Sequence, residues 1–471
     1  MAQDKATTDL ATASAVTMAA MVRERRASPV EITEAVLARI AAKEPALNAV
    51  VALDAEGARA AAREAEAAVM RGGVLGPLHG VPVTIKDVQA VAGLPTRRGS
   101  RLSDPSPATA DAPLVARLRA AGAIILGKTT STEQGWTAVS HNPLTGATHN
   151  PWKHGMTAGG SSSGAAALAG SGCGPLHVGT DGAGSIRLPA HFCGVVGFKP
   201  SYGRVPYVPV PNNGALSHAG PLARSVEDAA LMFSVLAGPH ALDHTTLPDR
   251  FPPEVAPGGL QGLRVAWSPD LGHARVDPEV AALAAAAVRA MEAAGALVEE
   301  VTPPWGPEGP ALERDIWGAA MRPFLGADDR AAAAMDPGLV ACTEAYRDFS
   351  FMQGHAAQTR RFAYAGRVNA WFEEAGFDVL ATPAASVAAF PVGLQRPPHW
   401  PPHDWDWLVW AEFSYPFNLS HGPAISVPCG VTEAGLPVGL QLAGPRLADA
   451  LVLRAGAGLL AVRPFEVAPA G

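Results

Sequence analysis

The feature that most restricts the fold is a strand–helix–strand run between residues 263 and 301. Residues 263–267 have the apolar pattern of a strand, and residues 297–301 predict a second one. Between them, Asp277, Pro278 and Glu279 start a helix that runs to about Ala294. A unit of this kind buries its strands in a sheet and covers that sheet with its helix, so it predicts the α/β class.

The N-terminal region is predicted to be helical. Ser28 has the position of an N-cap, Pro29 that of the first helical residue and Glu31 that of the partner in a capping box. Alanine-rich helical sequence continues from there, with interruptions, to about Met70. We therefore expect helices over most of the first 70 residues.

Apolar residues alternate over residues 78–87, which predicts a strand with Lys86 at its end. The other segments predicted are a strand at 123–126, a loop leading into a buried helix at 159–174, a glycine-rich turn at 179–184 and a surface loop rich in Pro and Trp at 388–405.

Composition excludes several classes of protein. Of 471 residues, 48% are hydrophobic and 17% charged, which suits a large core and not a disordered chain. The net charge is -7 and no basic block exceeds residues 23–26, so nucleic acid is not expected as a partner. Four scattered cysteines predict neither a disulfide framework nor a zinc site, and fit a reducing cytoplasm. The N-terminal charges follow the weak apolar stretch and no long apolar run occurs, so neither a signal peptide nor a membrane span is expected.

Two motifs suggest chemistry that the surrounding sequence does not support. Residues 122–129, GAIILGKT, match the phosphate-loop pattern, but the four central residues are the predicted strand itself and cannot form the loop. His240 and His244 have the spacing of metal ligands on a helix, but Pro239 and Pro248 flank them, which favours a polar turn. No metal or cofactor is therefore predicted.

Two glycine-rich segments contain serines, TAGGSSSG at 157–164 and GTDGAGSIR at 179–187. Glycine content alone favours flexible turns over a catalytic site. The other interpretation is acyl transfer, which needs a nucleophile, a base and backbone N–H donors for an oxyanion. Glycines allow backbone N–H groups to converge on one point. Lys86, at the end of an apolar strand, could supply the base, because burial lowers the pKa of a lysine.

At this point the chain resembles the amidase signature family, over nearly its whole length. The order and spacing of the similar segments make the resemblance specific. These segments are GVPVTIKD at 80–87, GGSSSG at 159–164, the long block at 179–204, NLSHGPAISVP at 418–428 and GLPVGLQ at 435–441.

The resemblance implies catalytic roles for three residues. Ser185 matches the family's nucleophile, Ser161 matches the serine whose peptide bond is cis, and Lys86 matches the base. Ser161 would pass a proton from Ser185 to neutral Lys86, and the reverse route would protonate the leaving amine.

Further residues are expected to support these three. The backbone N–H groups of Gly182, Ala183, Gly184 and Ser185 would form the oxyanion hole. Many relatives have glycine where Ala183 stands. The Ala183 methyl group would narrow the approach of a substrate without removing the Ala183 N–H donor. The residues expected to orient the site are Ser162 and Thr180, and those expected to pair and brace the loop are Asp181 and Arg187.

The resemblance further implies one domain over residues 1–471, with a central mixed sheet of about eleven strands covered by helices on both faces. Its expected parts are a helical region at about 1–75, a catalytic core at about 76–240 and a variable substrate-funnel region at about 300–415. The expected reaction is hydrolysis of small amides, anilides or carbamates through an acyl-enzyme, without metal or cofactor. A homodimer is compatible with the resemblance, because relatives are often dimers.

Two alternatives stay open: the glutaminase subunit of a tRNA-dependent amidotransferase, and a binding protein on an inactive scaffold. The segment 400–415 bears on the substrate because it is rich in aromatic residues: Trp400, Trp405, Trp407, Trp410, Phe413 and Tyr415. These side chains either pack a loop onto the core or line the substrate funnel. In the second case the substrate would be apolar or aromatic, whereas a glutamine pocket needs placed charges.

Overall fold

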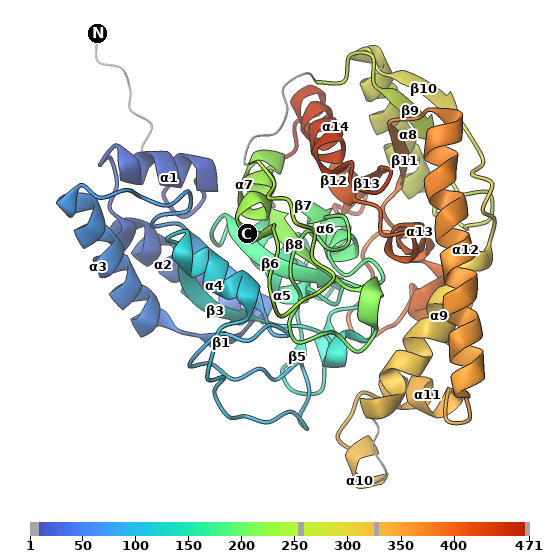
Figure 1. The fold of residues 1–471 in the computed structure, drawn as a ribbon, viewed down its shortest axis with the longest axis horizontal. Coiled ribbons are helices and arrows are strands. Elements are labelled where there is room, and N and C mark those ends of the chain that lie inside the picture. The colour runs from blue at the N-terminus through green and yellow to red at the C-terminus, as the bar shows by residue number, and fades with distance from the viewer. Residues whose placement is uncertain (1–8, 253–258, 325–328, 467–471) are drawn as a thin grey trace.

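A mixed sheet of eleven strands runs through the residues that this computed structural model describes, which are 9–252, 259–324 and 329–466 (Figure 1). In spatial order the strands are β1 (Val50–Leu53), β3 (Ile124–Thr129), β2 (Pro82–Lys86), β6 (Leu176–Asp181), β8 (His218–Ala223), β7 (Val196–Lys199), β12 (Ala424–Val431), β13 (Pro437–Ala443), β11 (Val379–Pro383), β9 (Arg264–Trp267) and β10 (Leu297–Glu300). Strand β2 is parallel to both β3 and β6, and β9 is parallel to β10 and β11. The strands between these two groups pair antiparallel. The mixed sheet expected from the resemblance is confirmed.

Helices cover both faces of this sheet. In β7, a Cβ on Gly197 would meet Ala190 of α6 at 2.6 Å, whereas the ring of the next residue, Phe198, lies 5.1 Å from that of Phe233 in α7. Successive residues of a strand point to opposite faces, so α6 and α7 lie on opposite sides of the sheet. The helices of the described residues are α1 (Ala15–Arg23), α2 (Pro29–Leu47), α3 (Ala55–Arg71), α4 (Pro113–Ala120), α5 (Ser163–Gly170), α6 (Arg187–Cys193), α7 (Val226–Leu236), α8 (Pro278–Ala293), α9 (Glu308–Met321), α10 (Asp329–Ala332), α11 (Pro337–Ala345), α12 (Phe351–Ala375), α13 (Tyr415–Leu419) and α14 (Asp449–Val462).

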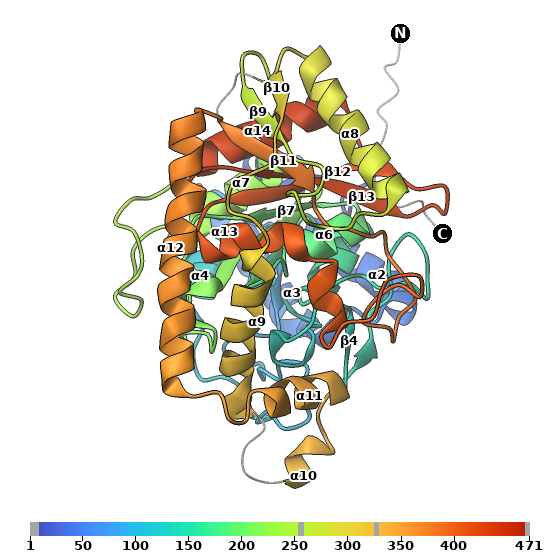
Figure 2. The ribbon, with the colours of Figure 1, turned by 90° about the vertical axis from the view of Figure 1, so that its right-hand side faces the viewer.

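Helices α9 and α12 pack side by side outside the sheet, next to α13 (Figure 2). The short elements are η1 (Glu133–Gly135), η2 (Gly214–Leu216), η3 (Arg322–Phe324), η4 (Asp406–Val409), η5 (Glu412–Ser414) and the strand pair β4 (His141–Asn142) and β5 (Gly146–Ala147). Within the described ranges, no helix is long and apolar enough to cross a membrane. Residues 1–8, on which the expectation of no signal peptide partly rests, lie outside the described residues.

Local sequence signals account for many of these elements. Ser28 caps α2 through the predicted capping box, in which the Ser28 side chain accepts from Glu31 N–H and the Glu31 carboxylate accepts from Ser28 N–H. The strands and helix predicted between residues 263 and 301 are confirmed as β9, α8 and β10.

The N-terminal region is helical with interruptions, as expected, and one of the interruptions is β1, which separates α2 from α3 and pairs with β3. Two other expectations about local structure were wrong. Residues 179–181 do not belong to a turn: they are the end of β6, where they pair with β8. The segment 388–405 does not lie on the surface throughout, because Trp400 and Trp405 are buried against other aromatic and apolar side chains.

The two motifs that resemble a phosphate loop and a metal site form a strand and a turn. Residues 124–129 form β3, and Lys128 Nζ lies 2.9 Å from Asp87 Oδ1 in a buried ion pair. Near His240 the chain turns, and Asp243 N–H donates to the His240 carbonyl oxygen at 3.0 Å. Over the residues described, no group of three or more potential metal-ligating side chains comes together.

Candidate active site

The parallel pairing of β2 and β6 brings two segments of the candidate site to one edge of the sheet. Ile85 is in register with Val178, so the carboxyl ends of the two strands lie next to each other. Lys86 is the last residue of β2, and Asp181 is the last residue of β6. The chain after Asp181 turns through Gly182–Ser185, which we call the oxyanion turn, and enters α6.

Lys86 is fully buried, and its amine lies among hydroxyl and carbonyl oxygens. Lys86 Nζ lies 2.7 Å from Ser161 Oγ, 2.9 Å from Thr180 Oγ1 and 3.4 Å from the Thr180 carbonyl oxygen. Burial lowers the pKa of Lys86 to about 7, against an opposing effect of the Asp181 carboxylate. A large share of Lys86 is therefore neutral near pH 7, and a neutral amine can accept a proton.

Ser161 and Ser162 precede α5 and connect the two serine segments. The Gly160–Ser161 peptide bond is cis. Ser162 N–H donates to the Ser185 carbonyl oxygen at 3.3 Å, and Ser162 Oγ both accepts from Thr180 N–H and donates to Thr180 O, each at 3.2 Å. Ser162 thus holds the end of β6 and the backbone of Ser185 beside the loop of Ser161.

Asp181 and Arg187 form a fully buried ion pair behind the oxyanion turn. The guanidinium donates to both carboxylate oxygens, with Nε and Nη2 each at 2.9 Å. Burial alone would raise the pKa of Asp181, but the charges of Arg187 and Lys199 and a hydrogen bond from Asn418 hold it below its usual range. The charged pair therefore links the end of β6 to the start of α6.

One expected oxyanion donor is already occupied. Gly184 N–H donates to Asp181 Oδ1 at 2.7 Å, and the carbonyl oxygen of the same peptide, that of Ala183, accepts from Ser414 Oγ at 2.8 Å. Because both ends of this peptide unit are held, its N–H cannot turn toward an oxyanion. The expectation for Gly184 was therefore wrong, and Gly182, Ala183 and Ser185 stay as candidate donors.

Three tryptophans border the oxyanion turn and the Ser161 loop; we call Trp136, Trp317 and Trp407 the indole cluster. The Trp407 ring makes edge contacts with those of Trp136 and Trp317, at 6.3 and 6.0 Å between centroids. Trp317 Nε1–H donates to the Trp136 carbonyl oxygen at 3.0 Å. A Cβ on Gly182 would meet the Trp317 ring at 2.8 Å, and one on Gly135, next to Trp136, would meet Ser161 Oγ at 3.4 Å. An apolar aromatic surface therefore adjoins the site.

The aromatic residues of segment 400–415 are all buried. Of these side chains, Trp407 belongs to the indole cluster, whereas Trp410 packs against Phe192 and Phe390. Packing onto the core thus describes the segment as a whole, and Trp407 links it to the surroundings of the oxyanion turn.

Sequence reasoning missed several residues that hold the site. Arg187 Nη1 donates to the Ser414 carbonyl oxygen at 3.1 Å and to Gln441 Oε1 at 2.7 Å, and Asn418 Nδ2 donates to Asp181 Oδ1 at 2.9 Å. Asn418 and Gln441 lie in segments that resemble the family, which was a usable signal. Trp317 and Ser414 lie outside those segments.

Comparison with known proteins decides the family. A family model described as Amidase matches residues 31–453. The chain belongs to the amidase signature family. It is 41% identical to an acylamidase of Rhodococcus erythropolis, covering 96% of each chain, and 34% identical to a glutamyl-tRNA(Gln) amidotransferase subunit of Salinispora tropica, covering 97% of this chain and 98% of the other. Its fold is similar to that of a bacterial aryl acylamidase described as an amidase signature enzyme, with a TM-score of 0.88 at 29% identity and 96% coverage of both chains. As a member of this family, the chain is an amide hydrolase.

Proposed function

We propose that this amidase forms an acyl-enzyme on Ser185, with Ser161 and Lys86 as its proton relay. The observation that supports this proposal most directly is the buried Lys86 amine, 2.7 Å from Ser161 Oγ and with its pKa lowered to about 7. Ser162 supports it too, because it holds the Ser185 backbone beside the Ser161 loop.

In the proposed reaction Ser185 Oγ attacks the carbonyl carbon of the substrate. Its proton passes to Ser161 Oγ, while the Ser161 proton passes to neutral Lys86. The N–H groups of Gly182, Ala183 and Ser185 stabilise the negative oxygen. The protons then return along the same route to the leaving amine. Water, deprotonated by the relay, releases the acyl group as a carboxylic acid.

The proposed substrates are small apolar or aromatic amides, anilides or carbamates. The indole cluster supports this class, because an aromatic surface next to the oxyanion turn favours apolar groups there. The acylamidase at 41% identity and the aryl acylamidase with the similar fold are consistent with it. Carbamates follow the same tetrahedral path, and carbon dioxide is lost after the acyl group is released.

The glutaminase component of a tRNA-dependent amidotransferase is the second candidate, supported by amidotransferase relatives at 34–35% identity. A comparison of kcat/KM on 4-nitroacetanilide, an N-aryl carbamate, glutamine and acetamide separates the two. We expect the aryl compounds to be preferred. A clear preference for glutamine would reject the proposed substrate class and favour the second candidate.

Labelling with a fluorophosphonate probe tests the nucleophile. The parent should be labelled at Ser185, and Ser185→Ala should lose the label and roughly 10³-fold or more of kcat. Ser163→Ala is the matched control: Ser163 is a buried serine at the start of α5, and the proposal gives it no role. Near-normal turnover by Ser185→Ala would remove Ser185 as the nucleophile, and an unlabelled parent without turnover would favour an inactive scaffold.

A further inference from the structure

A side-chain amide lies next to the oxyanion turn, that of Asn213, which directly precedes η2. A Cβ on Gly182 would meet Asn213 Nδ2 at 2.5 Å and the Trp317 ring at 2.8 Å. Because Gly182 has no side chain, the Asn213 amide can approach the backbone of the turn. Asn213 and Ser185 are 7% and 5% exposed, so the amide and the proposed nucleophile are enclosed to a similar extent.

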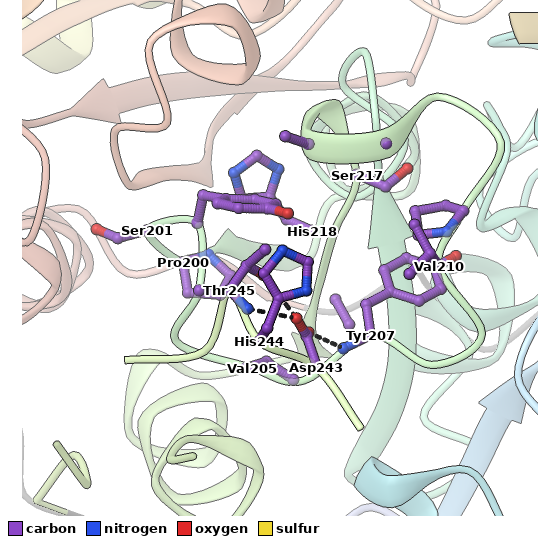
Figure 3. A pocket seen from close by; sticks show the side chains of 16 residues that line it. Pro200, Ser201, Val205, Tyr207, Val210, Ser217, His218, Asp243, His244 and Thr245 are labelled. Atoms are coloured by element: carbon purple, nitrogen blue, oxygen red, sulfur yellow. Dashed lines mark hydrogen bonds between the residues drawn. The ribbon is translucent and has the colours of Figure 1, made fainter. Parts of the chain in front are cut away.

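A neighbouring hydroxyl group determines which end of this amide faces the turn. Ser217 follows η2 and lines a pocket of about 240 Å³ together with Tyr207 and His218 (Figure 3). Its Oγ–H donates to Asn213 Oδ1 at 2.7 Å. Because Ser217 holds the amide oxygen, the amide nitrogen faces Gly182.

The nitrogen of this amide has hydrogens to donate and no group that accepts them. In the part of the chain that the structure describes, Asn213 Nδ2 has no hydrogen-bond partner. Trp317 also covers Gly182, but its Nε1–H already donates to the Trp136 carbonyl oxygen. An enclosed donor without an acceptor is unfavourable in the free protein, which indicates that an atom of a ligand accepts this bond.

We propose that Asn213 Nδ2–H donates to the negative oxygen of the tetrahedral intermediate. It thus takes the place of Gly184 N–H, which is bonded to Asp181. When Ser185 Oγ attacks the carbonyl carbon, the π electron pair moves to the carbonyl oxygen, and it returns when the amine leaves. No proton passes to or from Asn213. The hydrogen bond strengthens as the charge on the oxygen develops, so it stabilises the transition state more than the bound substrate. This inference rests on the proposed function, because it takes Ser185 as the nucleophile.

The first experiment is the turnover of 4-nitroacetanilide by Asn213→Leu in the full chain. Leucine removes the N–H donors at similar side-chain volume and adds no charge. We expect kcat to fall about 10²-fold, as for the removal of one oxyanion donor, and KM to stay within about twofold. Asn212→Leu is the matched control, because the neighbouring Asn212 donates through Nδ2 to the Ala320 carbonyl oxygen at 3.0 Å and has no role in the proposal. It should keep the parent kcat.

An aryl trifluoromethyl ketone provides a readout that a merely structural role would not change. Ser185 Oγ adds to its carbonyl carbon, and the resulting hemiketal oxygen is negative, as in the intermediate, but no amine can leave. The inhibition constant should rise in Asn213→Leu by about the factor by which kcat/KM falls, because both measure stabilisation of the same oxygen. A fall in kcat/KM with an unchanged inhibition constant would overturn the inference, and so would a parent-like kcat in Asn213→Leu.

Ser217 provides the test of orientation. Ser217→Ala frees the amide to rotate, and we expect kcat and the affinity for the ketone to fall together by about three- to tenfold. Ser217→Thr keeps the hydroxyl and should keep the parent values. If Asn213→Leu does not fold, as judged by thermal unfolding, this pair decides: parent-like kcat and ketone affinity in Ser217→Ala overturn the inference. Ser185→Ala separates the two proposals. Near-normal turnover there would reject the proposed function, whereas an inactive Ser185→Ala beside a parent-like Asn213→Leu would reject this inference alone.

Discussion

Among single residues, Lys86 has the property on which the proposed chemistry depends. Its pKa is lowered from 10.5 to about 7 by burial, so the neutral fraction rises as the pH passes upward through about 7. Activity should therefore rise through that range to an alkaline plateau. A profile of kcat/KM from about pH 5.5 to about pH 9 measures the limb. Lys86→Arg should be nearly inactive because guanidinium does not deprotonate in this range, and a parent-like profile in that variant would contradict a lysine base.

The burial of Lys86 also lowers the free energy of unfolding of the protein at neutral pH. In the unfolded chain lysine titrates near 10.4, whereas the folded enzyme holds Lys86 with a pKa of about 7. Between these values the unfolded state binds more protons, so this group's contribution to stability increases with pH. We expect Lys86→Met to raise the free energy of unfolding, and to raise it more at neutral pH than near pH 10. Urea denaturation of both proteins at the two pH values measures this difference, and an equal effect at both would contradict the lowered pKa.

Asp181 has a different role, because its carboxylate fixes the backbone of the oxyanion turn and takes no part in the proposed proton transfer. Its carboxylate accepts from Arg187, from Asn418 and from the N–H groups of Gly184 and Ile186. Asp181→Asn leaves Arg187 buried without its counter-charge, which costs about 3–5 kcal/mol. We therefore expect a lower unfolding free energy together with a lower kcat, measured by denaturation and by turnover on one aryl amide. A variant that loses stability but keeps the parent kcat would show that the turn needs no such brace.

Among the helices, α9 matters most to the surroundings of the site because it contributes Trp317. Replacement of Trp317 by Ala opens space over Gly182 and should cost about 3–5 kcal/mol of stability. It should also shift preference toward larger acyl groups, measured as the ratio of kcat/KM for benzoyl and acetyl 4-nitroanilides. Trp400→Ala is the control: Trp400 is similarly buried but packs against Arg275. An unchanged ratio in Trp317→Ala would separate the indole cluster from the acyl site.

The sequence predicted some helices and strands and missed others. Strand β2 and helix α8 were predicted because alternation and a Pro-containing start are local signals. Strand β1 was not, because its four residues lie between two alanine-rich helices and become a strand only by pairing with β3. The residues of the proposed relay were found through short motifs. The occupied N–H of Gly184 was not, because its acceptor depends on how the turn folds back on Asp181.

At the scale of the whole molecule, the site combines segments that are far apart in the chain. Ser414 reaches Ala183 across 231 residues, and Gln441 reaches Arg187 across 254. Local sequence contains no sign of such contacts, so only the resemblance pointed to the segments of Asn418 and Gln441. The fold accounts for the contact of Gln441 with Arg187, because β12 lies next to β7, β13 lies next to β12, and α6 packs against both β12 and β13.

The contacts that brace the oxyanion turn within this chain lead to a prediction about partners. Asp181 holds Gly184 N–H, Ser414 holds the Ala183 carbonyl oxygen, and Arg187 donates to the Ser414 carbonyl oxygen. We therefore expect the purified chain to hydrolyse an aryl amide without added subunits, as measured by turnover of fractions from gel filtration. Turnover that appears only after partner proteins are added would instead support the amidotransferase alternative.

The double hold on the Ala183–Gly184 peptide has a consequence for the order of events during protein synthesis. The segment of the proposed nucleophile leaves the ribosome early, but Ser414, which fixes that peptide, is made 231 residues later than Ala183. A nascent chain thus contains all three residues of the proposed relay long before Ser414 can fix the oxyanion turn. We expect hydrolytic activity to begin only near completion of the chain, so that unfinished copies do not attack amides in the cell.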